Sequence, residues 1–272
     1  MSPTPPARAH GPVRLLHLSD PHFGTEVPVV AEALLALAHE WAPTDIVVSG
    51  DMTQRATQRQ FAAAAAWLAR LPPAPLHILP GNHDLPWWPL WERALRPCAR
   101  VMALPGGWRG GVLSRPGLTL VGVDTTRWWR HQLGTLSTRQ IERVGQALRQ
   151  APRDDWRIVM THHPLSVRHA RDAADRPWGH ARALAHWQDC GVDTLLSGHL
   201  HEPAWWHTPR GALMAQAGTA VSRRLPPGQR HSVQGMVVQA QAGGPPWRGL
   251  QRWDFDPGQG RFTMVDERPL RA

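Results

Sequence analysis

The stretch LSDPHFG, residues 18–24, places a carboxylate and an imidazole two positions apart at the end of an apolar run. Asp20 and His22 project to the same side of an extended backbone, because side chains alternate along a strand. The stretch GHLH, residues 198–201, repeats this spacing with His199 and His201. Carboxylate and imidazole are common ligands of transition metals, so the residues of each pair are candidate metal ligands.

Three further segments, SGD, GNHD and THHP, place polar side chains directly after an apolar run. Their polar residues are Asp51, Asn82, His83, Asp84, His162 and His163. Ligands of open α/β sheets bind at the carboxyl ends of strands, so these groups are expected to converge. The donors are carboxylate, imidazole and amide without thiolate, which favours Mn, Fe or Zn. Their number suits two divalent or trivalent ions bridged by a carboxylate.

The elements that must position these residues alternate along the chain, which predicts an α/β fold with parallel strands and right-handed crossovers. Strands followed by polar loops are expected at 13–20, 44–51, 75–84, 118–126, 156–164 and 192–202. Helices are expected at 27–42, 58–71, 137–151 and 179–191, with later strands at 211–221, 232–242 and 250–265. Ser137 and Gln140 have the spacing of a capping box at the third helix. Loops around the substrate are expected at 85–115, 165–180 and 203–210.

Length and composition favour one domain. The 272 residues fit a single large α/β domain, predicted at 13–272 after a disordered Pro-rich tail at 1–12. No apolar run is long enough for a membrane span, and the first residues lack the apolar region of a signal peptide. Cys98 and Cys190 are the two cysteines, too few for a disulfide framework. A reduced, cytoplasmic protein is therefore expected, and oligomerisation is left open.

The charge of +9 has two readings. The chain has no Lys and no Tyr but abundant Arg, Ala, Gly, Pro and Trp, which is typical of genomic GC bias. An anionic partner is the other reading, because a basic field attracts anionic substrates. The arginines are scattered without a basic arm, so nucleic acid as a partner is not favoured over a small phosphorylated substrate.

The five motifs D-x-H, G-D, G-N-H-D, H-x-P and G-H-x-H, in this order, resemble those of the calcineurin-like metallophosphoesterase superfamily. The resemblance implies a four-layer α/β/β/α sandwich around a dinuclear metal centre. It implies a first metal held by Asp20, His22 and His201, a second held by Asn82, His162 and His199, and Asp51 as the bridge. Relatives that read H-Y-P keep the first position of THHP, which leaves His163 as a pocket residue.

The resemblance also implies an activity, that of a metal-dependent phosphoric ester hydrolase. SGDMTQ is similar to a stretch of the cyclic-nucleotide and glycerophosphodiester phosphodiesterases, so hydrolysis of a small phosphodiester by metal-bound hydroxide is expected. His83 would act as general acid on the leaving group. Asp84 would orient His83, or alternatively cap a helix or hold a loop. AGTAVSRR, residues 217–224, resembles a late motif of bacterial members and names no substrate.

Other residues carry weaker predictions. Trp87 could stack on a substrate base and Arg127 could clamp a phosphate, whereas packing and solvation are the alternatives. Trp88, Trp205 and Trp206 have the same two readings. A nuclease and a nucleotide-lipid pyrophosphatase are the alternative enzymes, although His83 replaces the arginine usual in the lipid A pyrophosphatases. A non-catalytic scaffold is the third alternative, and the complete ligand set argues against it.

Overall fold

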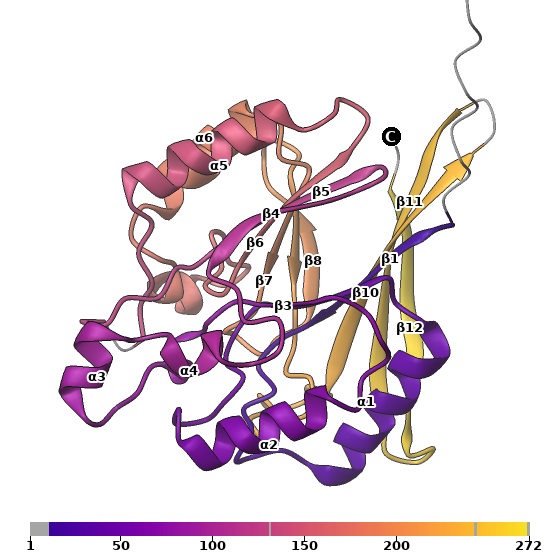
Figure 1. Cartoon of the computed structure of the whole chain (residues 1–272). Coiled ribbons are helices and arrows are strands. Elements are labelled where there is room, and N and C mark those ends of the chain that lie inside the picture. The colour runs from indigo at the N-terminus through magenta and orange to yellow at the C-terminus, as the bar shows by residue number, and fades with distance from the viewer. Residues whose placement is uncertain (1–10, 131, 242–243, 271–272) are drawn as a thin grey trace, which may run out of the picture.

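A computed structural model describes residues 11–130, 132–241 and 244–270. These residues form two six-stranded sheets that pack face to face, with helices on both outer faces (Figure 1). The predicted tail at 1–12 lies outside the described residues except for Gly11 and Pro12, and the domain boundary at Val13 stays a prediction. Among the described helices, none combines the length and the apolar character needed to cross a membrane.

The first sheet joins the N-terminal strands to the C-terminal end of the chain. Its strand order is β12 (Arg261–Leu270), β11 (Gly244–Asp256), β10 (Ser232–Gln241), β1 (Val13–Leu18), β2 (Asp45–Val48) and β3 (Leu76–Ile78). The strands β1, β2 and β3 are parallel, as the alternating pattern predicted, whereas β10 to β12 pair antiparallel. The carboxyl ends of the three parallel strands therefore meet at one edge.

The second sheet is built from the middle of the chain. Its strand order is β4 (Gly110–Arg115), β5 (Leu118–Val123), β6 (Trp156–Thr161), β7 (Thr194–Ser197), β9 (Leu213–Gln216) and β8 (Ala204–His207). The strands β5, β6, β7 and β9 are parallel, and the two edge strands run antiparallel to their neighbours. The strands β4 and β8 lie inside segments predicted as loops, because their short runs also contain glycine, arginine or tryptophan.

The helices begin and end near the predicted residues. They are α1 (Pro28–Trp41), α2 (Gln58–Leu68), α3 (Leu90–Leu95), α4 (Ala99–Met102), α5 (Thr138–Gln150) and α6 (His180–Asp189). Short 3-10 turns cover η1 (Asn82–Asp84) and η2 (Ala170–Asp175). The capping box predicted at α5 is present. The Ser137 side chain accepts from the backbone amide of Gln140, and the Gln140 side chain accepts from the backbone amide of Ser137. The short helices α3 and α4 were not predicted.

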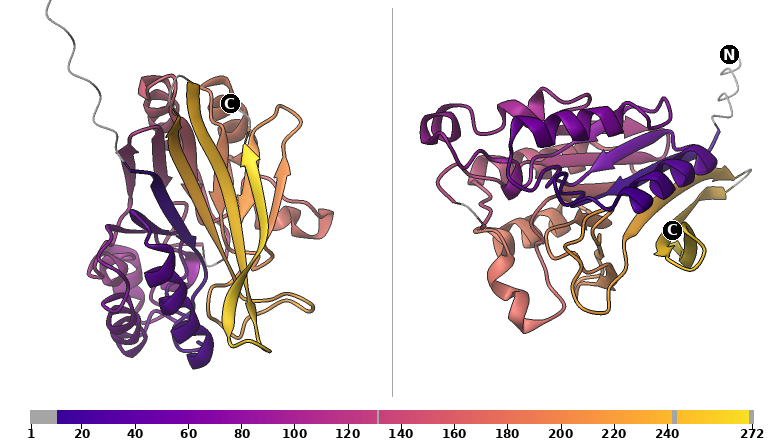
Figure 2. Two further views of the ribbon diagram at one scale, coloured as in Figure 1. Left: turned by 90° about the vertical axis from the view of Figure 1, so that its right-hand side faces the viewer. Right: turned by 90° about the horizontal axis from the view of Figure 1, so that it is seen from below.

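Three apolar cores lie between the layers. Side chains of β1 alternate between two of these cores. Leu16 and Leu18 pack with α1 and α2 on the outer side of the first sheet. Val13 and Leu15 point the other way, into the core between the two sheets. A third core, which includes Trp187, joins the second sheet to α5 and α6. The order is therefore helices, sheet, sheet, helices, as expected for a four-layer α/β/β/α sandwich (Figures 1 and 2).

Candidate metal centre

Both sheets deliver polar residues to one site. Asp20 and His22 follow β1, Asp51 follows β2, and Asn82 lies in the turn after β3. From the second sheet, His162 follows β6 directly. His199 and His201 follow β7 in the same way. The structure thus brings together all seven residues that the sequence predicted as metal ligands.

The first predicted ligand group surrounds Asp20. Nε2 of His201 lies 3.2 Å from Oδ1 of Asp20 and 3.0 Å from Nε2 of His22. Nε2 of His22 lies 3.6 Å from the same Asp20 oxygen. All three side chains are buried, and their potential ligand atoms lie within 4.8 Å of one another. These atoms are spaced as the ligands of one ion would be.

The second group surrounds His162, and Asp51 connects the two groups. Nε2 of His162 lies 3.1 Å from Oδ1 of Asn82. Oδ2 of Asp51 lies 3.4 Å from that nitrogen and 3.7 Å from Nε2 of His22. His162, His163 and His199 form one cluster of potential ligand atoms. One carboxylate oxygen therefore faces a histidine of each group, the position that a bridging ligand needs.

Backbone carbonyls orient two of the histidines. The carbonyl of Ser49 lies 3.0 Å from Nδ1 of His162, and the carbonyl of Arg224 lies 2.7 Å from Nδ1 of His201. A carbonyl can only accept, so each Nδ1 carries the proton and donates it. The Nε2 lone pair of each neutral ring is then directed into the site. Such second contacts commonly fix the tautomer and orientation of a metal-binding histidine.

The backbone at five candidate ligands adopts the left-handed region, which residues other than glycine seldom occupy. The φ values are +52° at Asp20, +44° at His22, +54° at Asp51, +74° at His199 and +59° at His201. Each costs about 1–3 kcal/mol. Such strain is concentrated where function requires a particular geometry, and here it turns side chains from successive strand ends toward one point.

Two glycines leave room for these side chains. A Cβ at Gly198 would collide with Oγ of Ser19 and Oδ2 of Asp20, and a Cβ at Gly81 would collide with Asp51. The backbone at both positions must therefore approach a candidate ligand more closely than any other residue allows. Gly81 and Gly198 each stand directly before a candidate ligand, a position for which the sequence predicts a close backbone approach, and this approach joins segments far apart in the chain.

A buried chain of polar groups positions the Asp20 carboxylate. Ser19 donates to Oδ2 of Asp20 over 2.5 Å, and Ser49 donates to Ser19 over 2.7 Å. Nε2 of His17 lies 2.9 Å from the Ser49 hydroxyl. The amide of His199 also donates to Oδ2 of Asp20, at 3.0 Å. These contacts leave Oδ1 directed toward the histidines of the first group.

The titration of the buried groups shows what the site attracts. Burial acts to raise the pKa of Asp20 and Asp51, but His201 holds the first and His162 the second well below the usual range. Burial opposes the charge on His162, yet Asp51 raises its pKa to about 9. The carboxylates thus draw a positive charge into the site, and a metal ion supplies that charge without a second proton on each imidazole ring. The donor set and its polarity fit metal ions.

His83 lies at the edge of the cluster. Its ring contacts the ring of His22 edge to face, with centroids 4.9 Å apart. The Gln54 carbonyl lies 2.8 Å from Nδ1 of His83, and the Arg224 guanidinium lies 2.8 Å from Nε2. Arg224 can only donate, so in this structure Nδ1 carries the proton and Nε2 accepts. Burial lowers the pKa of His83, and the Arg224 charge acts in the same direction.

The structure shows the alternative of a loop-holding carboxylate for Asp84, and its orienting role toward His83 stays a prediction. Asp84 accepts hydrogen bonds from the amides of Met52, Thr53 and Gly81 and from the Thr53 hydroxyl, at 2.8 to 3.0 Å. These bonds join the loops after β2 and β3. Burial raises the pKa of Asp84 to about 7, and nearby Asp51 adds to this, whereas the donors oppose it.

The three residues predicted to contact substrate have different surroundings. His163 lies 2.7 Å from the Thr125 hydroxyl and 2.9 Å from the Gln132 carbonyl, so both ring nitrogens are engaged by these two residues. Arg127 donates to the Thr126 carbonyl and to Gln140, which directs it toward the start of α5. Trp87 is 58% exposed. Their predicted contacts with substrate stay predictions.

Arg224 is the residue that sequence reasoning missed. Its guanidinium reaches His83 and its carbonyl orients His201, so one residue contacts both the predicted acid and a predicted ligand. The motif AGTAVSRR was recognised and ends at this residue, but no local spacing relates position 224 to position 83. Thr219 of the same segment donates to the Asp20 carbonyl over 2.5 Å.

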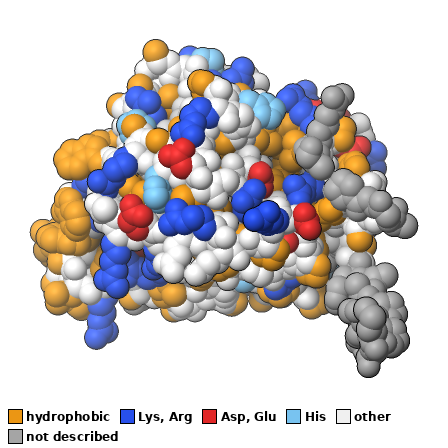
Figure 3. All heavy atoms as spheres, turned by 90° about the horizontal axis from the view of Figure 1, so that it is seen from above, with side chains coloured by type: hydrophobic (Ala, Val, Ile, Leu, Met, Phe, Trp, Pro, Cys, Tyr) orange, Lys and Arg blue, Asp and Glu red, His pale blue; other side chains and the backbone are white. Residues whose placement is uncertain are grey.

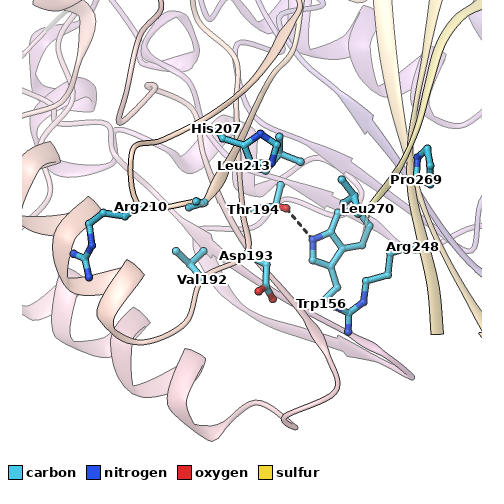
Figure 4. A pocket seen from close by; sticks show the side chains of 12 residues that line it. Trp156, Val192, Asp193, Thr194, His207, Arg210, Leu213, Arg248, Pro269 and Leu270 are labelled. Carbon is cyan, nitrogen blue, oxygen red and sulfur yellow. Dashed lines mark hydrogen bonds between the residues drawn. The ribbon is translucent and has the colours of Figure 1, made fainter. Parts of the chain in front are cut away.

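A large cavity lies away from this centre. Its volume is about 660 Å³, and its lining includes Trp156, Thr194 and Leu213 (Figure 4). Trp156, Thr194 and Leu213 are the first residues of β6, β7 and β9, whereas the candidate ligands follow the last residues of their strands. The cavity is therefore at the opposite edge of the sheet and takes no part in the candidate site.

Comparisons with known proteins agree with this geometry. A family model described as calcineurin-like phosphoesterase matches residues 13–203, which include every candidate ligand. No curated protein sequence matches the chain.

Solved structures share the fold at low identity. A dimetal phosphatase from Danio rerio superposes with a TM-score of 0.70 at 13% identity, over 96% of this chain and 99% of that one. The purple acid phosphatase PPD1 from yellow lupin superposes with a TM-score of 0.69 at 12% identity. The match covers 96% of this chain and 54% of the lupin chain. GAP50, the anchor in the inner membrane complex of Plasmodium, superposes with a TM-score of 0.62 at 11% identity. The match covers 96% of this chain and 89% of GAP50.

Proposed function

This chain belongs to the calcineurin-like phosphoesterase family, and from that premise we propose that it hydrolyses a small phosphodiester with two metal ions. A cyclic nucleotide or a glycerophosphodiester is the favoured substrate, because SGDMTQ is similar to the corresponding stretch of those phosphodiesterases. The observation that carries the proposal is Asp51, whose Oδ2 faces a histidine of each ligand group. A single-metal site would not need such a carboxylate.

Each predicted ligand has a place in this proposal. Asp20, His22 and His201 would hold one ion, Asn82, His162 and His199 would hold the other, and Asp51 would bridge them. The bound ions would activate water for attack on phosphorus and neutralise charge on the phosphoryl oxygens. We propose Mn, Fe or Zn as the bound metals, because the ligands are carboxylate, imidazole and amide groups.

His83 and Arg224 would serve the leaving group and the phosphate. Arg224 is exposed and lies at the edge of the ligand cluster, so an arriving phosphate could draw its guanidinium away from His83. Nε2 of His83 would then face the substrate, with Nδ1 still held by the Gln54 carbonyl. Once the guanidinium has moved away, Nε2 would take up a proton from water, and the resulting imidazolium would donate that proton to the departing alkoxide.

A scaffold without activity is the competing function. It is disfavoured because all seven predicted ligands and His83 are present and adjacent. Strained backbone at five of them would be maintained without a benefit in a chain that binds no metal.

The test is hydrolysis of bis-p-nitrophenyl phosphate by metal-stripped protein with Mn²⁺ restored, beside Asp51→Asn. Turnover that requires Mn²⁺ and falls by at least about 10²-fold in Asp51→Asn is expected. Asp189→Asn, an exposed carboxylate on α6 that pairs with Arg210, is the matched control and should keep full activity. Absence of turnover and of bound metal would establish the scaffold instead.

A substrate panel tests the finer part of the proposal. Cyclic nucleotides and glycerophosphodiesters should be hydrolysed with higher kcat/KM than p-nitrophenyl phosphate. A clear preference for the monoester would replace the phosphodiesterase by a phosphatase and leave the metal centre in place.

A further inference from the structure

Tryptophan is unusually exposed on one part of this molecule. The six tryptophans that are largely exposed in the described parts of the chain are Trp87, Trp88, Trp91, Trp128, Trp129 and Trp178. Their exposed fractions range from 45% to 75%. They come from three short segments, at 87–91, 128–129 and 178, although tryptophans occur throughout the sequence. We call these residues, with Leu90 and Leu95 of α3, the tryptophan face.

Contacts between the three segments hold the tryptophan face together. The guanidinium of Arg93, a buried residue of α3, donates to the Trp128 carbonyl over 2.6 Å and to the Pro86 carbonyl over 3.2 Å. The guanidinium of Arg130 stacks on the Trp178 ring, 3.5 Å from its centroid. The side chains therefore belong to one continuous surface.

The tryptophan face projects from the body of the protein. In Figure 1, α3 lies at the outer end of the molecule, on the side away from β10 to β12. Figure 3 shows hydrophobic side chains gathered on that side, with arginine side chains next to them. Leu90, Trp91 and Leu95 of α3 are 63%, 62% and 76% exposed. An exposed apolar patch of this kind marks a surface that contacts a partner or a membrane.

The charge around the tryptophan face is positive. Segments 85–100 and 127–130 contain five arginines and one acid, Glu92, and without the buried Arg93 their net charge is +3. The Glu92 carboxylate is already paired with Arg100, at 2.6 Å, so it offers little repulsion to an anion. Arg96 is exposed directly after α3. A partner of this surface therefore needs to be both apolar and anionic.

We propose that the tryptophan face docks onto the surface of an anionic phospholipid bilayer. Indole rings have an apolar body and one polar N–H, and they favour the boundary between acyl chains and headgroups. Leucine adds apolar area there, and arginine is attracted to anionic headgroups. A second copy of the chain would bring one positive surface against another, because symmetric dimers use the same patch twice.

This inference goes beyond the proposed function and does not depend on it. The tryptophan face starts four residues after His83 along the chain, so docking would bring the candidate metal centre close to the membrane surface. The attachment itself uses neither the metal ligands nor His83. Binding and hydrolysis can therefore be measured, and can fail, separately.

Vesicle co-sedimentation tests the proposal with the full-length protein. Vesicles of phosphatidylcholine alone are compared with vesicles that contain about 30% phosphatidylglycerol. The variant is Trp88→Ala/Trp91→Ala/Leu95→Ala, which leaves Trp87 and the metal ligands in place. The matched control is Val29→Ala/Met264→Ala/Val265→Ala, three exposed apolar residues of α1 and β12. Circular dichroism checks that both variants fold.

The wild-type and control proteins should bind the anionic vesicles, and the tryptophan-face variant should bind at least about tenfold more weakly. Binding should weaken from about 0.1 M to about 0.5 M NaCl, because salt screens the arginines. Asp51→Asn should bind like the wild type even if it hydrolyses nothing. Equal binding by the tryptophan-face variant, or no binding by the wild type, would overturn the proposal. Self-association through this face without vesicle binding, seen by analytical ultracentrifugation, would also overturn it and identify a second copy as the occupant.

Discussion

At the scale of single residues, His83 and Arg224 carry the chemistry that metal ions cannot supply. His83 is held by the Gln54 carbonyl on one side and faces Arg224 on the other. Its ring nitrogens contact two different segments, and its backbone amide donates to Oδ1 of Asp51 at 2.8 Å, whereas the side chains of the predicted metal ligands face the shared carboxylates. The two kinds of residue should therefore respond differently to substitution.

His83→Ala should lower kcat by about 10²–10⁴-fold for a diester with an alkoxide leaving group. The loss should be much smaller with bis-p-nitrophenyl phosphate, because nitrophenolate leaves without a proton. Metal content should stay unchanged. Steady-state kinetics with both substrates measure the ratio, with His39→Ala on α1 as the control. An equal loss with both substrates would contradict the role of a proton donor.

His17 makes folding sensitive to acid. Burial lowers its pKa from 6.5 to about 4, so the folded state resists a proton that the unfolded state accepts. Its contribution is complete above pH 6.5 and is lost as the pH falls toward 4, by about 2 kcal/mol at pH 5. Urea unfolding at pH 7 and pH 5 should show this loss, and His17→Gln should reduce it. An unchanged pH dependence in His17→Gln, with His39→Gln as control, would disprove the assignment.

At the scale of elements, the loops after β2 and β3 form one unit because Asp84 joins them. Its carboxylate accepts from Met52 and Thr53 of one loop and from Gly81 of the other. Asp51, the predicted bridge, and Asn82, a predicted ligand of the second ion, lie in these two loops. The relative position of the loops therefore depends on a residue that need not touch the substrate.

Asp84→Ala should reduce both stability and metal content. Removal of the carboxylate leaves three buried amides without acceptors, and each costs about 1–3 kcal/mol. Thermal unfolding and elemental analysis of the purified protein measure the two effects. If Asp84 acted only on His83, kcat would fall while the metal content and Tm stayed at wild-type values.

At the scale of the whole molecule, the site lies where two sheets present their carboxyl ends to each other. The sheets are held by the core between them, which includes Leu15 of β1 and Met160 of β6. Burial of apolar side chains maintains the separation of the two ligand groups. The strained backbone and the repulsion between carboxylates destabilise this arrangement of the ligand groups. Bound cations would relieve the repulsion.

Metal removal should therefore lower Tm. A ligand that binds only the folded state stabilises it by about 2.7 kcal/mol at a hundred times its Kd. Calorimetry with and without Mn²⁺ should show a higher Tm with metal in the wild type and a much smaller shift in Asp51→Asn. A shift of equal size in both proteins would place the bound Mn²⁺ elsewhere.

The sequence by itself predicted the alternation of the longer helices with the parallel strands and the polar residues that follow these strands, but not β4, β8, α3 or α4. Asp20, Asp51 and His162 follow apolar runs directly, and such spacing is fixed by the local backbone. The resemblance of five motifs then implied the division into two ligand groups, which the structure brings together. The sequence also predicted that β1, β2 and β3 are parallel, because short apolar segments alternate with helical segments along the chain.

Only the tertiary structure decided which distant groups meet. Arg224 contacts His83 across 141 positions of sequence, and Asp84 joins the loops after β2 and β3. The strands β4 and β8 form because edges of a packed sheet accept short segments of weak propensity. The tryptophan face likewise depends on Arg93, which ties together segments that no local pattern relates. Contacts between distant segments follow from packing, which the spacing of residues along the chain does not encode.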